Sequence, residues 1–489
     1  MTAAPTGSHP YRALWAMMVG FLLIVVDSTI VTVANPVIKR DFDATYDAVI
    51  WVTSAYLLVF AVFLLVGGRL GDRFGPKNVY LAGLALFIVS SVWCGLSESI
   101  GMLIGGRVAQ GIGAALLAPQ TLSAVTRTFP AERRGVAMSL WGATAGVGMF
   151  VGPLAGGVLV DGLGWQWVFL VNVPIGVVGL VMAVRLIPAL PTRRYRLDIL
   201  GVLLSGAGIC LIVFGLQEGQ NHDWASWIWA VIAGGFALLA AFVVWQSVQR
   251  HEPLIPLSLF RHRDFSLSNA GIALISFAVV ACAVPLMFYL QEVCGLSPTR
   301  SALVTTPMAI ATGVLAPVVG RLVDRFQPRA IVGPGFAALA IALAWLSLEM
   351  DPATPVWRLV LPLTVIGAAG AFTWEPLAVT ASRTLPPDLA GAGSAVYNTV
   401  RQVGAVLSSA SIAALMTALL GAEPGDAAVR LPDSLKGPFA DAMSQSMLLP
   451  AFAAALGVIT ALFFVGRPEP ASRPVPSKYP SKRNVGVAL

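Results

Sequence analysis

Long apolar stretches recur along almost the whole chain, and the charged residues gather in the short segments between them. A helix needs about 20 apolar residues to cross the hydrocarbon core of a membrane. The pattern predicts an all-α integral membrane protein with fourteen transmembrane helices. We expect the spans at 13–34, 48–68, 79–97, 100–121, 136–160, 167–186, 199–216, 226–248, 266–290, 301–320, 330–348, 356–378, 390–420 and 446–466.

The composition agrees with a membrane protein and argues against several other classes. Of the 489 residues, 57% are hydrophobic and 11% charged, whereas a soluble domain has about 25% charged residues. Cys94, Cys210, Cys282 and Cys294 lack ligand-like spacing, so neither a metal site nor a disulfide framework is predicted. The sequence has no nucleotide-binding loop and no Gly-x-Ser-x-Gly elbow. We therefore expect no enzymatic activity and no cofactor.

The distribution of Lys and Arg predicts the orientation, because cytoplasmic loops are richer in these residues than external ones. With the N-terminus inside, the internal segments hold 23 Lys and Arg, the external segments hold 6, and Arg107 and Arg401 lie within spans. This bias predicts a multi-pass protein of the cell membrane with both termini in the cytoplasm. It also explains the net charge of +7 as topology rather than nucleic-acid binding.

A ten-residue motif occurs twice. The segment 68–77 reads GRLGDRFGPK and the segment 320–329 reads GRLVDRFQPR, with seven identical positions. The copies follow the second and tenth predicted spans, and this offset of eight indicates two six-helix bundles separated by an inserted pair. We therefore expect a first bundle at 1–187, linkers and inserted helices at 188–264, and a second bundle at 265–466. A disordered basic tail is expected at 467–489.

The first copy is predicted to turn tightly at the inner membrane face, because glycines stand at 68, 71 and 75. Asp72 can cap a helix or pair with an arginine, and such a contact would break when two bundles rock. The charged and glycine positions expected to form this switch in the two copies are Gly68, Arg69, Gly71, Asp72, Arg73, Gly75, Lys77, Asp324 and Arg325.

Asp27 and Arg107 are charged residues inside predicted spans, where charges are costly and normally face a partner or a wet cavity. Each lies about seven residues from the outer end of its predicted helix, which is roughly 10 Å at 1.5 Å per residue. The two side chains could therefore meet. A static ion pair that only anchors the two helices is the alternative to a functional role.

Two further spans carry residues that could line a cavity or a close contact. In the fifth span, Gly148, Gly152 and Gly156 are four residues apart and make one smooth helix face, beside Pro153 and Gly157. In the second half, Asn398, Arg401 and Gln402 share a helix face. Glu375 either neutralises Arg401 or merely reaches internal water.

These motifs, with Leu103–Ala115 around Arg107 and the segment Trp165–Pro174, occur in the order typical of one family. The chain resembles the major facilitator superfamily, and within it the fourteen-spanner drug:proton antiporters of the QacA/EmrB type, from about Trp15 to Gly466. The resemblance implies that 68–77 is the signature loop between helices 2 and 3. It also implies that the glycines around Gly152 and Pro153 form the motif of antiporters, and that a proton gradient supplies the energy.

The sequence therefore predicts a proton-coupled antiporter that exports amphipathic small molecules by alternating access and functions as a monomer in the lipid bilayer. Burial disfavours a charged carboxylate and a nearby arginine favours it, so movement of Arg107 would switch proton binding at Asp27. A dedicated exporter of a native metabolite, siderophore or lipid is one alternative. A non-transporting membrane sensor is another, although charged residues within spans argue against it.

Overall fold

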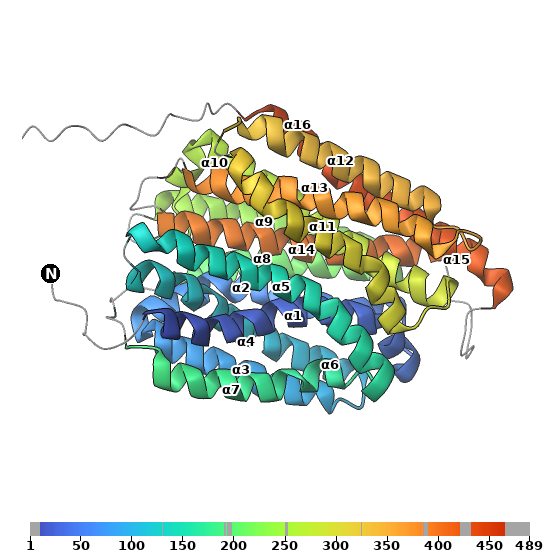
Figure 1. Ribbon diagram of the computed structural model, residues 1–489, viewed down its shortest axis with the longest axis horizontal. Helices are drawn as coiled ribbons and strands as arrows, with labels where there is room; N and C mark the ends of the chain where they lie inside the picture. The colour runs from blue at the N-terminus through green and yellow to red at the C-terminus, as the bar shows by residue number, and fades with distance from the viewer. Residues whose placement is uncertain are drawn as a thin grey trace, which may run out of the picture.

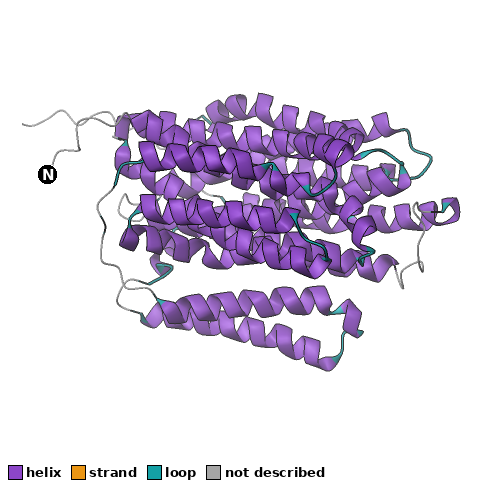
Figure 2. Cartoon of the chain, turned by 90° about the horizontal axis from the view of Figure 1, so that it is seen from below, coloured by secondary structure: helices purple, strands orange, loops and turns teal. Residues whose placement is uncertain are grey.

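The computed structural model describes residues 10–129, 131–189, 192, 198–249, 253–323, 325–383, 385, 390–420 and 432–464. Across these residues the elements are helical, and Figure 2 shows helices and loops without a strand in the described chain. Fourteen candidate spans in the described residues are long and apolar enough to cross a membrane. The predicted all-α fold with fourteen membrane helices is therefore confirmed.

The first six spans contain α1 (Pro10–Phe42), α2 (Tyr46–Phe74), α3 (Pro76–Gly95), α4 (Ile100–Thr128) and α5 (Ala131–Leu163), followed by the short α6 (Trp167–Leu170) and α7 (Asn172–Leu186). The next two spans are α8 (Ile199–Glu218) and α9 (Ser226–Val248), with the 3-10 turn η1 (Gln220–His222) between them.

The last six spans begin after the 3-10 turn η2 (Leu257–Arg261). They contain α10 (Arg263–Phe288) with its terminal π-turn η3 (Tyr289–Val293), α11 (Pro298–Val323), α12 (Pro328–Glu349), α13 (Val356–Arg383) and α14 (Ala390–Leu420), and then α15 (Asp433–Ser446) and α16 (Leu448–Leu462), which together form the final span.

The helices of the first six spans form one set, and those of the last six spans form a second set. Two helices of each set make most of the contact between the sets. In Figure 1, α1 to α4 and α7 lie in the lower part, and α10, α12, α13 and α16 in the upper part. Within the sets, α4 packs on α2 and α3, α1 on α5, and α13 on α11 and α12. Between them, α14 packs along α2 and α11 along α5. The helices α8 and α9 pack on each other, and α8 also contacts α2 and α14.

The largest differences from the predicted spans are at two helix ends. The first span was expected to end at residue 34, but α1 continues to Phe42 with Pro36 inside it. A membrane helix tolerates such a proline, because neighbouring groups can satisfy the backbone carbonyl that it frees one turn earlier. One turn after the proline, Arg40 Nε donates to the Pro36 carbonyl at 3.4 Å. The last span was expected to start at residue 446, but helical structure begins at Asp433. The first turns of this helix are polar, so the hydropathy pattern places them in a loop.

The segment 68–77 is mostly helix rather than loop. Gly68 and Gly71 lie inside α2, and the turn is confined to Gly75, whose φ of 92° favours glycine. The prediction of a turn at all three glycines was therefore wrong for two of them. A Cβ at Gly71 would meet the side chain of Gln120 on α4, so this glycine permits close helix packing.

Several predicted features lie outside the described residues. They are Asp324 of the second motif, residues 193–197 of the predicted linker, the segment 421–431 between the last two predicted spans, and the tail after residue 464.

Candidate functional site

A buried ion pair joins the middle of α1 to α4. Arg107 Nη1 donates to Asp27 Oδ2 at 2.6 Å, and the exposed fractions of the two side chains are 1% and 0%. The helices are apolar around this point, so the pair is removed from water on all sides. The two residues that the sequence analysis selected on depth are therefore in contact.

The second carboxylate oxygen of Asp27 accepts two further hydrogen bonds. Gln110 Nε2 donates to Asp27 Oδ1 at 2.9 Å, and Asn172 Nδ2 donates to the same oxygen at 3.0 Å. Gln110 lies one turn after Arg107 on α4, whereas Asn172 is the first residue of α7. Both oxygens of the acid are thus held by protein donors, and no substrate group can reach them in this state.

Gln110 connects the acid to the arginine and to α3. Its Oε1 accepts from Arg107 Nη1 at 2.6 Å, and its Nε2 also donates to Ser91 Oγ at 2.9 Å. Ser91 in turn donates to the Phe87 carbonyl at 2.7 Å. This network satisfies every atom of the glutamine amide, which is required when a polar group is fully buried.

Arg107 is held from two other directions. Its Nε donates to the Val52 carbonyl of α2 at 3.0 Å. The guanidinium carbon lies 4.1 Å from the centre of the Tyr56 ring and 5.7 Å from that of Phe169, distances at which an aromatic face attracts a cation. The described residues contain no group of His, Cys, Asp and Glu that could hold a metal ion.

The glycine face of α5 packs against the helix that carries Asp27. A Cβ at Gly148 would come within 2.7 Å of Val25, one at Gly152 would clash with Thr29, and one at Gly156 would come within 2.7 Å of Ile30. The close approach of α5 to α1 therefore depends on these glycines. The neighbouring Gly157 faces α11 instead, where a Cβ would lie 2.7 Å from Thr299.

The motif 68–77 contacts both its neighbours and a distant linker. Arg69 Nη2 donates to the Pro253 carbonyl at 2.8 Å, which ties the end of α2 to the segment that follows α9. Lys77 Nζ donates to the Val184 carbonyl in α7 at 2.8 Å, and the Arg73 guanidinium lies 5.2 Å from the Phe74 ring centre. In the second copy, a Cβ at Gly320 would meet nothing within 4 Å, and the amide of Arg325 donates to the Leu322 carbonyl.

The candidate residues of the second half do not join the Asp27 cluster. Asn398 donates to the Ser394 carbonyl of its own helix at 2.9 Å, and Gln402 is buried. Glu375 is exposed. In the described part of the chain, Arg401 makes no ion pair with Glu375 or any other acid, so of the two alternatives for Glu375 the neutralisation of Arg401 does not occur in this state.

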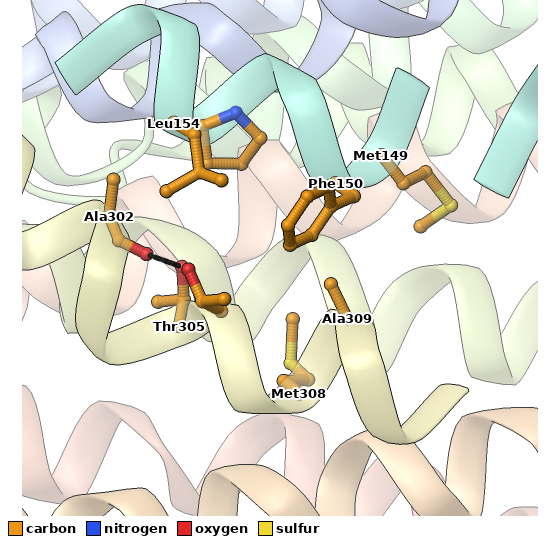
Figure 3. A pocket seen from close by; sticks show the side chains of 9 residues that line it. Met149, Phe150, Leu154, Ala302, Thr305, Met308 and Ala309 are labelled. Atoms are coloured by element: carbon orange, nitrogen blue, oxygen red, sulfur yellow. Dashed lines mark hydrogen bonds between the residues drawn. The ribbon is translucent and has the colours of Figure 1, made fainter. Parts of the chain in front are cut away.

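A small apolar pocket lies where α5 meets α11. Figure 3 shows Met149, Phe150 and Leu154 of α5 opposite Thr305 and Met308 of α11. The Thr305 hydroxyl donates to the Ala302 carbonyl of its own helix rather than into the pocket. The volume is about 30 Å³, whereas small-molecule sites have about 300 Å³ or more. The pocket is therefore too small for an amphipathic substrate in this state.

Four polar contacts join the two sets of helices in the half of the molecule where α1 ends. Gln291 Nε2 donates to the Val33 carbonyl at 2.9 Å, and the Thr299 amide donates to Asp161 Oδ2 at 3.0 Å. The hydroxyls of Ser54 and Ser409 are 2.7 Å apart. Arg40 and Glu292 form a longer ion pair, with Nε and Oε1 3.8 Å apart.

Sequence reasoning missed part of the site. It selected Asp27 and Arg107 but left Gln110 and Asn172 without a role, although both lie in motifs used to assign the family. Each is an amide side chain within an apolar segment, and that is the signal that could have identified them. The packing of Tyr56 and Phe169 on Arg107 has no sequence signal, because aromatic residues are common in membrane helices.

The chain is similar in sequence to a known family and to several known proteins. Residues 17–409 match the Major Facilitator Superfamily. The chain is 58% identical over 470 residues to an uncharacterized MFS-type transporter of Mycobacterium tuberculosis, which covers 94% of this chain and 81% of that protein. It is 34% identical over 418 residues to the tetracenomycin C resistance and export protein of Streptomyces glaucescens, covering 84% and 77%.

The chain is also similar to a multidrug resistance protein and, in its fold, to a solved structure. The multidrug resistance protein Stp of Mycobacterium tuberculosis is 31% identical over 411 residues, covering 84% of this chain and 76% of that protein. The crystal structure of a D-xylose-proton symporter superposes with a TM-score of 0.64 at 15% identity, covering 93% of this chain and 98% of that chain. The likeness to the symporter is one of fold.

Proposed function

Because the chain belongs to the major facilitator superfamily, whose members are transporters, we propose that it is a proton-coupled antiporter that exports amphipathic small molecules. The observation that supports this function best is the buried carboxylate of Asp27, held by Arg107 in a dry part of the first set of helices. Relatives named for drug resistance and export agree with the direction of transport.

The proposed coupling uses the ion pair as a switch. While Arg107 contacts Asp27, the ionised carboxylate is favoured, and the proton is released. If the helices move and the two groups separate, the buried carboxylate is left without its cation and binds a proton, because an unpaired charge is costly in an apolar interior. The proton can then cross as the site changes the side to which it opens, in exchange for the exported molecule.

We also propose the orientation and the place of substrate binding. With both termini in the cytoplasm, the four contacts near the end of α1 lie on the external side, and the state described here is closed to the outside. Parallel helix bundles of this kind hold substrate near the midplane at their interface and move by rocking. The boundaries 1–187, 188–264 and 265–466 are proposed as the units of that motion.

Proton release from purified protein tests this function. Protein in detergent and weak buffer is mixed with tetraphenylphosphonium, ethidium or a panel of antibiotics, and a pH-sensitive dye reports released protons between about pH 5 and 9. Wild type should release protons when a substrate binds, and Asp27→Asn should release none because the amide cannot titrate. Asp223→Asn, which alters an exposed acid in the turn between α8 and α9, is the matched control.

Two outcomes would argue against the proposal. If Asp27→Asn releases protons like wild type, the coupling site lies elsewhere, and Glu375 becomes the next acid to test. If no compound causes proton release from wild type while transport in vesicles persists with a protonophore present, the protein is not a proton antiporter.

The names of several relatives favour a second candidate, a dedicated exporter of one native product. Besides the tetracenomycin C exporter, they include a probable actinorhodin transporter of Streptomyces coelicolor and a cephamycin export protein of Amycolatopsis lactamdurans, which are 33% and 34% identical to this chain. A substrate panel in an efflux-deficient host distinguishes the two. Resistance to many unrelated compounds supports a multidrug exporter. Resistance to a single chemical class supports a dedicated exporter.

A further inference from the structure

Arg107 and Arg401 both lie several residues inside their helices, and they have opposite environments. Arg107 is fully buried and satisfied by Asp27, Gln110 and the Val52 carbonyl. Arg401 of α14 forms no ion pair in the part of the chain that the structure describes, and its Nε has no hydrogen-bond partner. One positive charge within the spans is therefore uncompensated.

The surroundings of Arg401 contain a second unused donor. Tyr397 precedes it by one helical turn, which places both side chains on the same face of α14. The Tyr397 hydroxyl is buried and has no partner, and the tyrosine lies close enough to Arg401 to interact with it electrostatically. The face thus offers a guanidinium group and a hydroxyl with nothing bound to either.

The position of this face suits a ligand. The helix α14 belongs to the second set of helices and packs along α2 of the first, so the helix that carries Arg401 lies at the junction of the two sets. Arg401 is partly exposed rather than sealed, and a charged side chain inside a span normally faces a partner or a water-filled cavity. Within the described residues, Arg401 forms no ion pair and its Nε has no hydrogen-bond partner, so the guanidinium can take a bound molecule.

Glu375 does not take that place. It lies on α13 near enough to act on Tyr397 electrostatically, but its side chain is exposed and forms no ion pair with Arg401. An exposed carboxylate keeps most of its hydration, so its attraction to a cation at a distance is weak. Glu375 therefore does not neutralise the charge of Arg401, and a bound ligand can do so.

We propose that Arg401, assisted by the Tyr397 hydroxyl, is a binding site for the anionic group of an exported amphipathic molecule, such as a carboxylate or a phenolate. The planar guanidinium presents paired N–H donors that match the two oxygens of a carboxylate. The inference rests on the proposed export function and specifies its substrate class as amphipathic acids. Asp27 is not part of this site, since both its oxygens are occupied.

Binding of three matched probes tests the proposal without requiring the native substrate. Naphthoate, the neutral naphthamide and the cationic naphthylmethylammonium share one ring and differ in charge. Each is titrated calorimetrically into purified protein in nanodiscs, with empty nanodiscs subtracted. Wild type should bind naphthoate about tenfold more tightly than naphthamide, the factor expected from one charge-assisted contact. Arg401→Gln should reduce the two affinities to within about twofold of each other.

Further variants separate recognition from folding. Arg401→Lys should keep part of the preference, because the charge remains and the fork is lost, and Tyr397→Phe should weaken naphthoate binding about threefold. Arg358→Gln removes a different arginine, at the start of α13 and paired with Glu349, and should behave like wild type. If Arg401→Gln does not fold, the Lys and Phe variants decide the question.

The proposal is wrong if wild type binds naphthoate no better than naphthamide, or if the preference survives in Arg401→Gln. It is equally wrong if neither Arg401→Lys nor Tyr397→Phe changes naphthoate binding. Asp27→Asn keeps the two proposals distinguishable. It should retain the preference for the anion while losing proton release, so a failure of proton coupling would leave the binding result unchanged.

Discussion

At the scale of single residues, the distinctive feature is an acid whose two oxygens are satisfied inside the first helices. Asp27 is held by Arg107 and Gln110 from α4 and by Asn172 from α7. A buried charge is tolerated when it is both paired and hydrogen-bonded. Removing one member of such a group leaves the others buried without a partner, so the variants should not be equivalent.

Arg107→Ala should destabilise the protein more than Asp27→Asn does. Both variants break the buried ion pair, for which the loss is about 3–5 kcal/mol. Arg107→Ala also removes the hydrogen bonds to Gln110 and the Val52 carbonyl, whereas Asp27→Asn keeps them and leaves an amide that can still hydrogen-bond. Adding Asp27→Asn to Arg107→Ala should recover part of the loss. Thermal unfolding in detergent compares the stabilities of the three variants. If the double variant loses the sum of the two single losses of stability, the expected coupling between the residues is contradicted.

A second residue, outside the spans, should give the stability a dependence on pH. Asp198 precedes α8 and accepts from the Gly201 amide at 2.9 Å, Trp245 Nε1 at 2.8 Å and Gln246 Nε2 at 2.7 Å. Burial raises the pKa of Asp198, but these hydrogen bonds together outweigh burial and hold its pKa below the ordinary value. The ionised carboxylate therefore links α8 to α9.

The sign of the pH effect follows from the lowered pKa of Asp198. Its contribution is fully present above the unfolded pKa of about 3.9 and is lost as the pH falls through the lower folded value. Asp198→Asn should lower the melting temperature at pH 7, and the difference from wild type should shrink below about pH 4. Asp223→Asn should give no such convergence, and a constant difference for Asp198→Asn would refute the explanation.

At the scale of elements, the contact between α1 and α5 depends on a face of α5 that consists of glycines. Gly148, Gly152 and Gly156 let α5 approach the helix that carries Asp27. The glycine spacing in the sequence predicted a smooth face, but it did not say which helix would cover it. The structure shows that this face is covered by α1, the helix that carries the acid.

Gly152→Val should disturb this contact, because its side chain would overlap Thr29 of α1. Inserting methyl groups into a tight interface costs about 1–3 kcal/mol, and we expect a lower melting temperature together with slower transport. Gly146→Val lies six residues earlier on α5, where a Cβ meets nothing within 4 Å, and should remain close to wild type. Equal effects of the two valines would show that the α1 contact is not the cause.

At the scale of the whole molecule, the two sets of helices are joined by polar contacts near the end of α1. Gln291, Thr299 and Ser409 in the second set contact Val33, Asp161 and Ser54 in the first. Under the proposed alternating access, these contacts must break when the half of the molecule in which α1 ends opens. Each is a single hydrogen bond, which contributes about 1 kcal/mol, so the closed side is held by forces that a rocking motion can overcome.

A cross-link across this junction should stop transport. The Ser54 and Ser409 hydroxyls are 2.7 Å apart, so Ser54→Cys and Ser409→Cys place two sulfur atoms within reach of a disulfide. In a background lacking the four native cysteines, oxidation should abolish transport, and reduction should restore it. Each single variant is the control. Undiminished transport by the oxidised double variant would show that this junction does not open.

The sequence by itself determined the membrane-spanning character, the number of spans and the family, because apolar length and ordered motifs are local properties of the chain. It also identified Asp27 and Arg107, since charges are rare in membrane helices and therefore conspicuous. It predicted the end of α1 and the start of the final span wrongly, because hydropathy does not report where a helix continues beyond the hydrocarbon.

Only the tertiary structure decided how the charges are satisfied. Asn172 reaches Asp27 from 145 residues away, Gly71 serves helix packing rather than a turn, and Arg401 forms no ion pair with Glu375. The physical reason is common to all three. Hydrogen bonds and ion pairs act over about 3 to 4 Å, and which side chains come that close depends on how the helices are placed around one another.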